Sequence, residues 1–135
     1  MLRVTSGVTG VLVIGVINTD GLLYQLYPNR WSSADPGFGG GVMRAGETRL
    51  IGGPDGSFVF CASAPAGSAR IIAAILPPGP GLDAWLGQAV DLRPVSTPGL
   101  WLATLGRLAA EARAAAGLPV NLALGTRSFD VVSGQ

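Results

Sequence analysis

Short apolar runs separated by turn-forming residues open the chain. Residues 8–17 are rich in β-branched side chains, and residues 22–27 are apolar and aromatic, which is typical of strands. Between them, residues 18–21 (Asn-Thr-Asp-Gly) are of the types that tolerate positive φ in tight turns. Pro28 cannot donate a hydrogen bond to a strand ladder, so it ends the second run or places it at an edge. The pattern predicts a β-hairpin.

Further apolar runs alternate with segments rich in Gly and Pro. The run at residues 69–76 is almost uninterrupted, which favours a strand that is covered on both faces. Residues 82–92 are ambiguous and fit one helical turn followed by an extended piece. The other predicted strands are residues 48–51, 57–63, 120–124 and 128–132.

One segment near the end of the chain has helical periodicity. Thr97 can cap its beginning, Pro98 suits the first helical position, and Gly117 can end it. Apolar residues recur along it at helical spacing and predict one face toward a core. These residues are Trp101, Leu105, Leu108, Ala112 and Ala115.

At least six short strands and one late helix predict a mainly β fold. We expect an antiparallel β-sandwich or partly open barrel with one C-terminal α-helix over about residues 97–117. A doubly wound α/β fold would need a helix after nearly every strand, and the first part of the chain lacks them. We expect a single domain over residues 1–135, in which the Pro-Gly break at 77–81 separates the strand-rich part from the tail.

Composition narrows the classes of function. The chain has 135 residues, of which 48% are hydrophobic and 13% charged, and all nine basic residues are Arg. With a net charge of +1 and no basic cluster, nucleic-acid binding is not expected. No apolar run approaches the roughly 20 residues of a membrane helix, so no membrane span is expected either. The sequence leaves the compartment open. The abrupt start in strand-like sequence fits a piece of a longer protein.

The residues for most catalytic chemistry are missing or scattered. The chain has no His, which excludes a Ser-His-Asp or Cys-His site made by this chain alone. Cys61 lies in an apolar segment and is expected to be a small buried hydrophobe rather than a nucleophile. The Gly-rich residues 37–41 lack the pattern of a phosphate loop. We therefore expect no metal, no cofactor and no enzymatic activity, with a carboxylate-based hydrolase as the less favoured alternative.

The loop of residues 30–41 carries the candidate binding residues. Arg30, Trp31 and Phe38 combine a planar cation with two aromatic rings, which suits a protein contact. The same rings could instead fold back and cap an open end of the sandwich. The sequence does not decide between the two.

Three segments together resemble the bacterial domain family DUF4384. They are "VLVIGVINTDGLLYQLYPN" at 11–29, "MRAGETRLI" at 43–51 and "FVFCASAPAGSARIIAAIL" at 58–76. The resemblance covers about residues 3–76, and the tail at 77–135 matches less well. The positions that carry it are Asp20-Gly21, Leu26-Tyr27-Pro28-Asn29, Ala45-Gly46-Glu47 and Pro65-Ala66-Gly67.

The resemblance implies a non-catalytic accessory or interaction module. Such domains often accompany caspase-like peptidases, protein kinases or envelope lipoproteins in larger bacterial chains, in the cytoplasm or the cell envelope. It implies no catalytic residues, and the shared Gly, Pro and Asn positions have a structural reading in turns. The expected partner is another protein or an adjacent domain. An oligomerising structural domain is the alternative, suggested by the low charge and high apolar content.

Overall fold

A computed structural model describes residues 1–32, 39–53, 66–88, 94–117 and 123–131. Strands dominate it, and the pairings between the described strands are antiparallel. The strands are β1 (Leu2–Thr5), β2 (Gly10–Ile17), β3 (Leu23–Tyr27), β4 (Val42–Met43), β5 (Thr48–Ile51), β6 (Gly67–Leu76), β7 (Pro94–Ser96) and β8 (Ala123–Val131), and the helices are α1 (Pro80–Gln88) and α2 (Pro98–Ala116).

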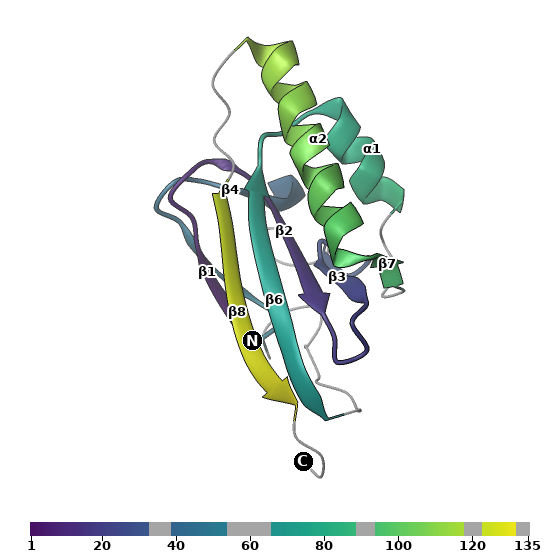
Figure 1. Ribbon diagram of the computed structural model, residues 1–135. Coiled ribbons are helices and arrows are strands. Elements are labelled where there is room, and N and C mark those ends of the chain that lie inside the picture. The colour runs from purple at the N-terminus through teal and green to yellow at the C-terminus, as the bar shows by residue number, and fades with distance from the viewer. Residues whose placement is uncertain (33–38, 54–65, 89–93, 118–122, 132–135) are drawn as a thin grey trace.

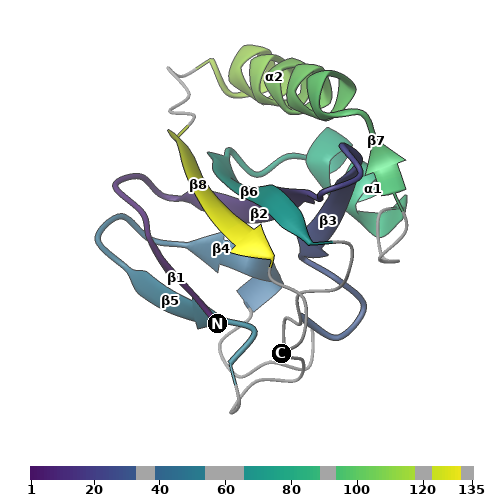
Figure 2. The same ribbon diagram turned by 60° about the horizontal axis from the view of Figure 1, so that its bottom comes forward.

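The described elements form three layers. The central layer is a six-stranded sheet in the order β7-β3-β2-β6-β8, with β4 paired to the beginning of β2 (Figure 1). Figure 2 shows α1 and α2 on one face of this sheet and the two-stranded β1–β5 sheet on the other. Because β2 lies in the middle of the central layer, its side chains are buried on both faces.

The layer of helices packs on alternate residues of β2 and β6. Trp101, Leu105 and Leu108 of α2 are at most 5% exposed and form one apolar cluster with sheet residues such as Val13 and Ile72. Leu82 of α1 joins the same cluster, and Trp85 packs against it. The helical stripe predicted from the sequence is therefore the packing face as far as Leu108, while Ala112 is half-buried and Ala115 exposed.

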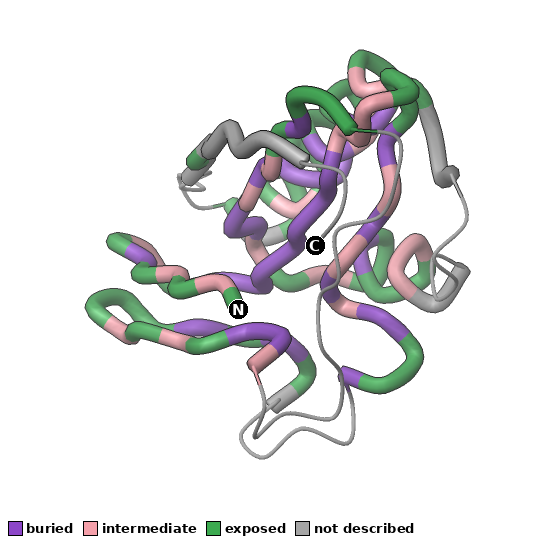
Figure 3. Tube along the Cα trace, turned by 90° about the horizontal axis from the view of Figure 1, so that it is seen from below, coloured by how far each residue is buried: buried purple, intermediate pink, exposed green. Residues whose placement is uncertain are grey.

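The β1–β5 sheet covers the opposite set of side chains. Leu12, Ile14 and Ile75 of the central sheet pack there with Ile51 of β5. A register shift in the β2–β3 ladder places Tyr27 opposite Ile14, although Gln25 is opposite Gly15. Side chains on opposite residues of a ladder share a face, so the shift turns Tyr27 into this second cluster. Figure 3 shows the buried residues along the chain in purple.

The sequence predictions for the fold are confirmed in outline. The hairpin, the strand at 48–51 and the helix near 97–117 are present, and no closed barrel forms among the described strands. Thr97 caps α2 by accepting from Leu100 N at 3.4 Å, and Gly117 ends it with a φ of 63°.

Two expectations need correction. The prediction of one helix was incomplete, because residues 82–88 of the ambiguous stretch belong to α1. Leu82 packs in the apolar cluster on the central sheet and so holds this helix in place. Two separate strands were expected at 120–124 and 128–132, but the described residues of this region form one strand, β8, whose nine residues pair continuously with β6. The predicted strand at 57–63 and Cys61 lie outside the described residues.

Candidate interaction site

A hydrogen-bonded turn follows β3 and presents the first two candidate residues. The Asn29 side-chain oxygen accepts from the backbone N–H groups of Trp31 at 2.9 Å and Ser32 at 3.0 Å. The Asn29 amide group donates to the Leu26 carbonyl at 2.8 Å, and the Ser32 hydroxyl accepts from Asn29 N at 2.8 Å. Asn29 and Ser32 are both buried. The buried side chains of Asn29 and Ser32 thus hold the turn at 29–32 from inside.

Arg30 and Trp31 stand on the outer side of this turn. The Arg30 guanidinium carbon lies 4.3 Å from the centroid of the Trp31 ring, within the range of a cation–π contact. Trp31 is 37% exposed, and Arg30 is exposed as well. The structure therefore brings these two candidates together as one stacked pair, called the Arg30–Trp31 pair below. Phe38 lies outside the described residues.

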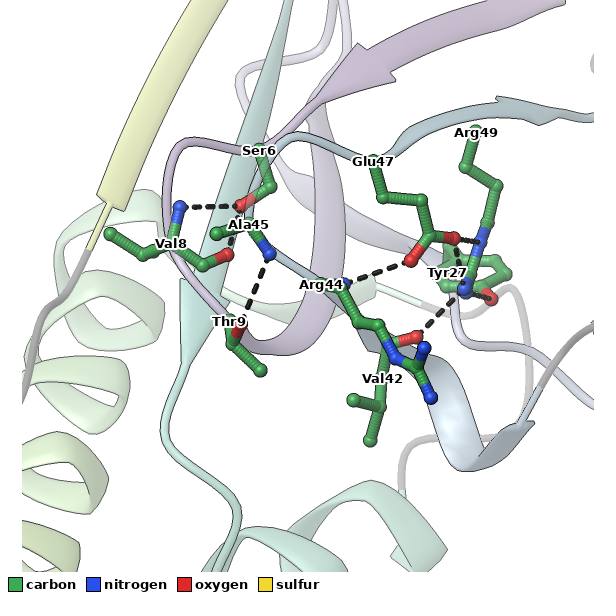
Figure 4. A network of polar contacts seen from close by, with 9 residues as sticks. All are labelled: Ser6, Val8, Thr9, Tyr27, Val42, Arg44, Ala45, Glu47 and Arg49. Atoms are coloured by element: carbon green, nitrogen blue, oxygen red, sulfur yellow. Dashed lines mark hydrogen bonds and ion pairs between the residues drawn. The ribbon is translucent and has the colours of Figure 1, made fainter.

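A second polar cluster joins the Tyr27 and Glu47 motif positions (Figure 4). Arg49 lies between them, donating to Glu47 Oε1 at 2.7 Å and to the Tyr27 hydroxyl at 3.4 Å. Arg44 N donates to the other Glu47 oxygen at 2.8 Å. The Arg44 N–H first, and then the Arg49 guanidinium, hold the pKa of Glu47 below its usual value. The Glu47 carboxylate thus binds the turn before β5 and Arg49 of β5, and Arg49 in turn joins β5 to Tyr27 of β3.

The turns at 6–9 and 44–47 are tied together by backbone hydrogen bonds. Gly46 N donates to the Ser6 carbonyl at 2.7 Å, and Ser6 N donates to the Glu47 carbonyl at 3.1 Å. Ala45 N adds a bond to the Thr9 hydroxyl at 3.0 Å, as Figure 4 shows. Gly46 has a φ of 83°, which other residues adopt only with strain. The Ala-Gly-Glu positions therefore have a structural role at the junction of the two sheets.

The described carboxylates are mostly engaged in similar local contacts. Asp20 accepts from Leu22 N at 2.9 Å and from the Tyr24 hydroxyl at 2.8 Å, and this hydrogen bond raises the pKa of Tyr24. Glu111 accepts from Arg107 at 2.8 Å on the surface of α2. Within the described part of the chain, no three His, Cys, Asp or Glu residues gather as a metal site would require.

A cavity of about 410 Å³ lies where α1 begins beside the end of α2. Apart from the Glu111 side chain, small or apolar residues line it. They are Pro78, Gly79, Pro80, Gly81, Leu82, Leu108, Ala112 and Ala115. This volume is within the usual range of ligand pockets, about 300–1,000 Å³. We call it the α1–α2 cavity.

Sequence reasoning singled out Arg30 and Trp31 but missed the Glu47–Arg49–Tyr27 cluster and the α1–α2 cavity. Glu47 and Arg49 have opposite charges and lie two residues apart at the start of the predicted strand 48–51, and this spacing was the available signal for the cluster. The cavity had no local signal, because residues 78–82 and 108–115 meet only in the folded chain. Neither described helix combines the length and apolar character needed to cross a bilayer.

These observations define a β-rich, three-layer domain whose motif residues hold its turns and join its sheets. The sequence model of one family, described as "Domain of unknown function (DUF4384)", matches residues 2–77, more than half of the chain. The chain belongs to this family, as the motifs at 11–76 predicted. The tail beyond residue 77 nonetheless supplies both helices and the strands β7 and β8 of the central sheet. Comparisons with curated proteins and with solved structures found no match.

Proposed function

We propose that the chain is a non-catalytic interaction module of a larger bacterial protein, such as a caspase-like peptidase. The observation that supports this most is the Arg30–Trp31 pair. It combines an exposed indole and a stacked guanidinium on a turn that buried side chains hold in place. Trp and Arg are enriched among the residues that carry most of the energy of protein interfaces. A fixed turn also lowers the entropy lost on binding.

The roles of the family positions agree with a scaffold. Asp20, Asn29 and Glu47 each accept hydrogen bonds from backbone N–H groups of neighbouring turns. Side chains used in this way fix loop geometry, and the exposed surface is left to contact a partner. The alternative of a carboxylate-based hydrolase would require acids that face a common substrate, whereas Asp20 and Glu47 are committed to local bonds.

Photo-cross-linking in cells of the source organism tests the proposal. We expect the full-length protein with p-benzoylphenylalanine in place of Trp31 to give a discrete adduct with one protein, or an internal cross-link to another domain. Leu102 of α2 is the matched control position, because it is 38% exposed, against 37% for Trp31. The same probe at position 102 should not give that product.

Two results would contradict the proposed function. The first is the absence of any discrete product from position 31 under conditions where the protein is folded and abundant. The second is an identical set of products from positions 31 and 102, which would indicate collision rather than recognition.

A further inference from the structure

We propose that the partner of the Arg30–Trp31 pair is a second copy of this chain, and that the pair docks into the α1–α2 cavity of that copy. The inference rests on the proposed function, because it uses the same two residues as contacts. It adds the receiving site and the identity of the partner.

The cavity has the chemistry to accept an indole. Its walls are the rings of Pro78 and Pro80 and the aliphatic side chains of Leu82 and Leu108. A cavity of about 410 Å³ is within the range of pockets that hold small organic molecules, about 300–1,000 Å³, and an indole is smaller than most of these. The small residues that line the rest of the cavity allow the ring to approach α2 closely.

A carboxylate at the same cavity suits the Arg30 guanidinium. Glu111 uses Oε1 to accept from Arg107, whereas among the described residues Oε2 has no hydrogen-bond donor. A Cβ atom placed on Gly81 would lie 3.2 Å from Glu111 Oε2, so this oxygen faces the first turn of α1 at the cavity. A guanidinium presents several donors in a plane and can share a carboxylate with Arg107.

The two halves of the proposed contact lie on separate parts of one molecule. The residues that line the cavity come from 78–82 and 108–115, and the turn at 29–32 does not contribute to it. One copy therefore offers an exposed cation and aromatic ring, while it also carries an apolar cavity with a carboxylate. The apolar lining suits the Trp31 ring and Glu111 Oε2 suits the Arg30 guanidinium, which points to a head-to-tail contact between copies. Such a contact makes chains or rings rather than a simple two-fold dimer.

The experiment is light scattering on the full 135-residue chain over a concentration series that reaches about 1 mM, the range of weak contacts. We expect species larger than dimers to appear with concentration. Trp31→Ala removes the ring, and Ala115→Arg fills the cavity and offers a cation to Glu111 at an i,i+4 spacing. Each variant should raise the concentration for association at least about tenfold.

A mixture of the two variants tests the proposed contact most directly. Trp31→Ala keeps its cavity, and Ala115→Arg keeps its Trp31. A mixture of the two should therefore form a discrete 1:1 dimer that grows no further. Leu102→Ala and Ala114→Arg are the matched controls, because both residues are exposed and neither lines the cavity. These controls should associate as the unchanged chain does.

The self-docking proposal is overturned if the unchanged chain stays monomeric over the whole series. It is also overturned if the variants associate normally, or if the mixture stays monomeric. A cross-link from position 31 to a different protein would support the proposed function while overturning self-docking. An adduct of two copies of this chain, with a cross-linked peptide from 78–82 or 108–115, would support both.

Discussion

Replacing Leu105 with alanine is expected to lower the free energy of unfolding by about 2–5 kcal/mol. Leu105 is 2% exposed and packs from α2 into the cluster on the helical face of the central sheet. Removing its side chain loses apolar burial and leaves a cavity that the neighbouring Trp101 cannot close without moving. A urea titration followed by circular dichroism measures the loss.

Leu100 is the matched control for this substitution. It lies on the same helix but is 63% exposed, so Leu100→Ala should change the stability by no more than about 0.5 kcal/mol. Equal losses from the two variants would mean that the packing face of α2 is wrongly assigned.

The second large effect is expected from Gly10→Ala, at the beginning of β2. A Cβ atom on Gly10 would lie 2.5 Å from the Leu76 carbonyl oxygen and 2.7 Å from a methyl carbon of Ile75. The nearest obstacle is backbone in the adjacent strand, which cannot move aside as a flexible side chain can. We expect a loss of about 1–3 kcal/mol in the same titration, as for other overpacked positions.

Gly7 provides the control in the preceding turn. A Cβ atom on Gly7 would meet no atom within 4 Å, so Gly7→Ala should stay within about 0.5 kcal/mol of the unchanged chain. A mild effect at Gly10 as well would show that β2 and β6 are farther apart at this end than described.

The features that the sequence predicted well are those determined by nearby residues. The turn at 18–21 is closed by its own side chains, with Thr19 N donating to Asn18 Oδ1 at 2.9 Å and Leu22 N donating to Asp20 Oδ1. The ends of α2 follow from Thr97 and Gly117 in the same way. Local hydrogen bonds and local φ preferences suffice for these features, so their residue types predict them.

The features that it missed depend on distant contacts. β1 pairs with β5 from Leu2 opposite Ile51, and no local pattern specifies that partner. Pro80 suits the first position of α1, but Gly81 and Gly87 are poor helix formers, so packing of Leu82 and Trp85 on the core decides its structure. In α1, tertiary contacts therefore override local propensity.

The candidate site also combines features that the sequence predicts with features that depend on distant contacts. The residue types at Arg30 and Trp31 indicated a contact surface, but their exposure and stacking depend on how Asn29 holds the turn. The hydrogen bond from Arg49 to Tyr27 joins residues 22 positions apart, which pattern reasoning on single segments does not detect.

The central claim is that Trp31 is a contact residue and not a cap on the fold. The most direct measurement is the free energy of unfolding of Trp31→Ala against the unchanged chain, by urea titration at a concentration where both are monomeric. An exposed contact residue predicts a change of no more than about 1 kcal/mol, because the turn is held by Asn29 and Ser32. A loss of about 3 kcal/mol or more, typical of a buried Trp, would contradict the claim and assign Trp31 to the core.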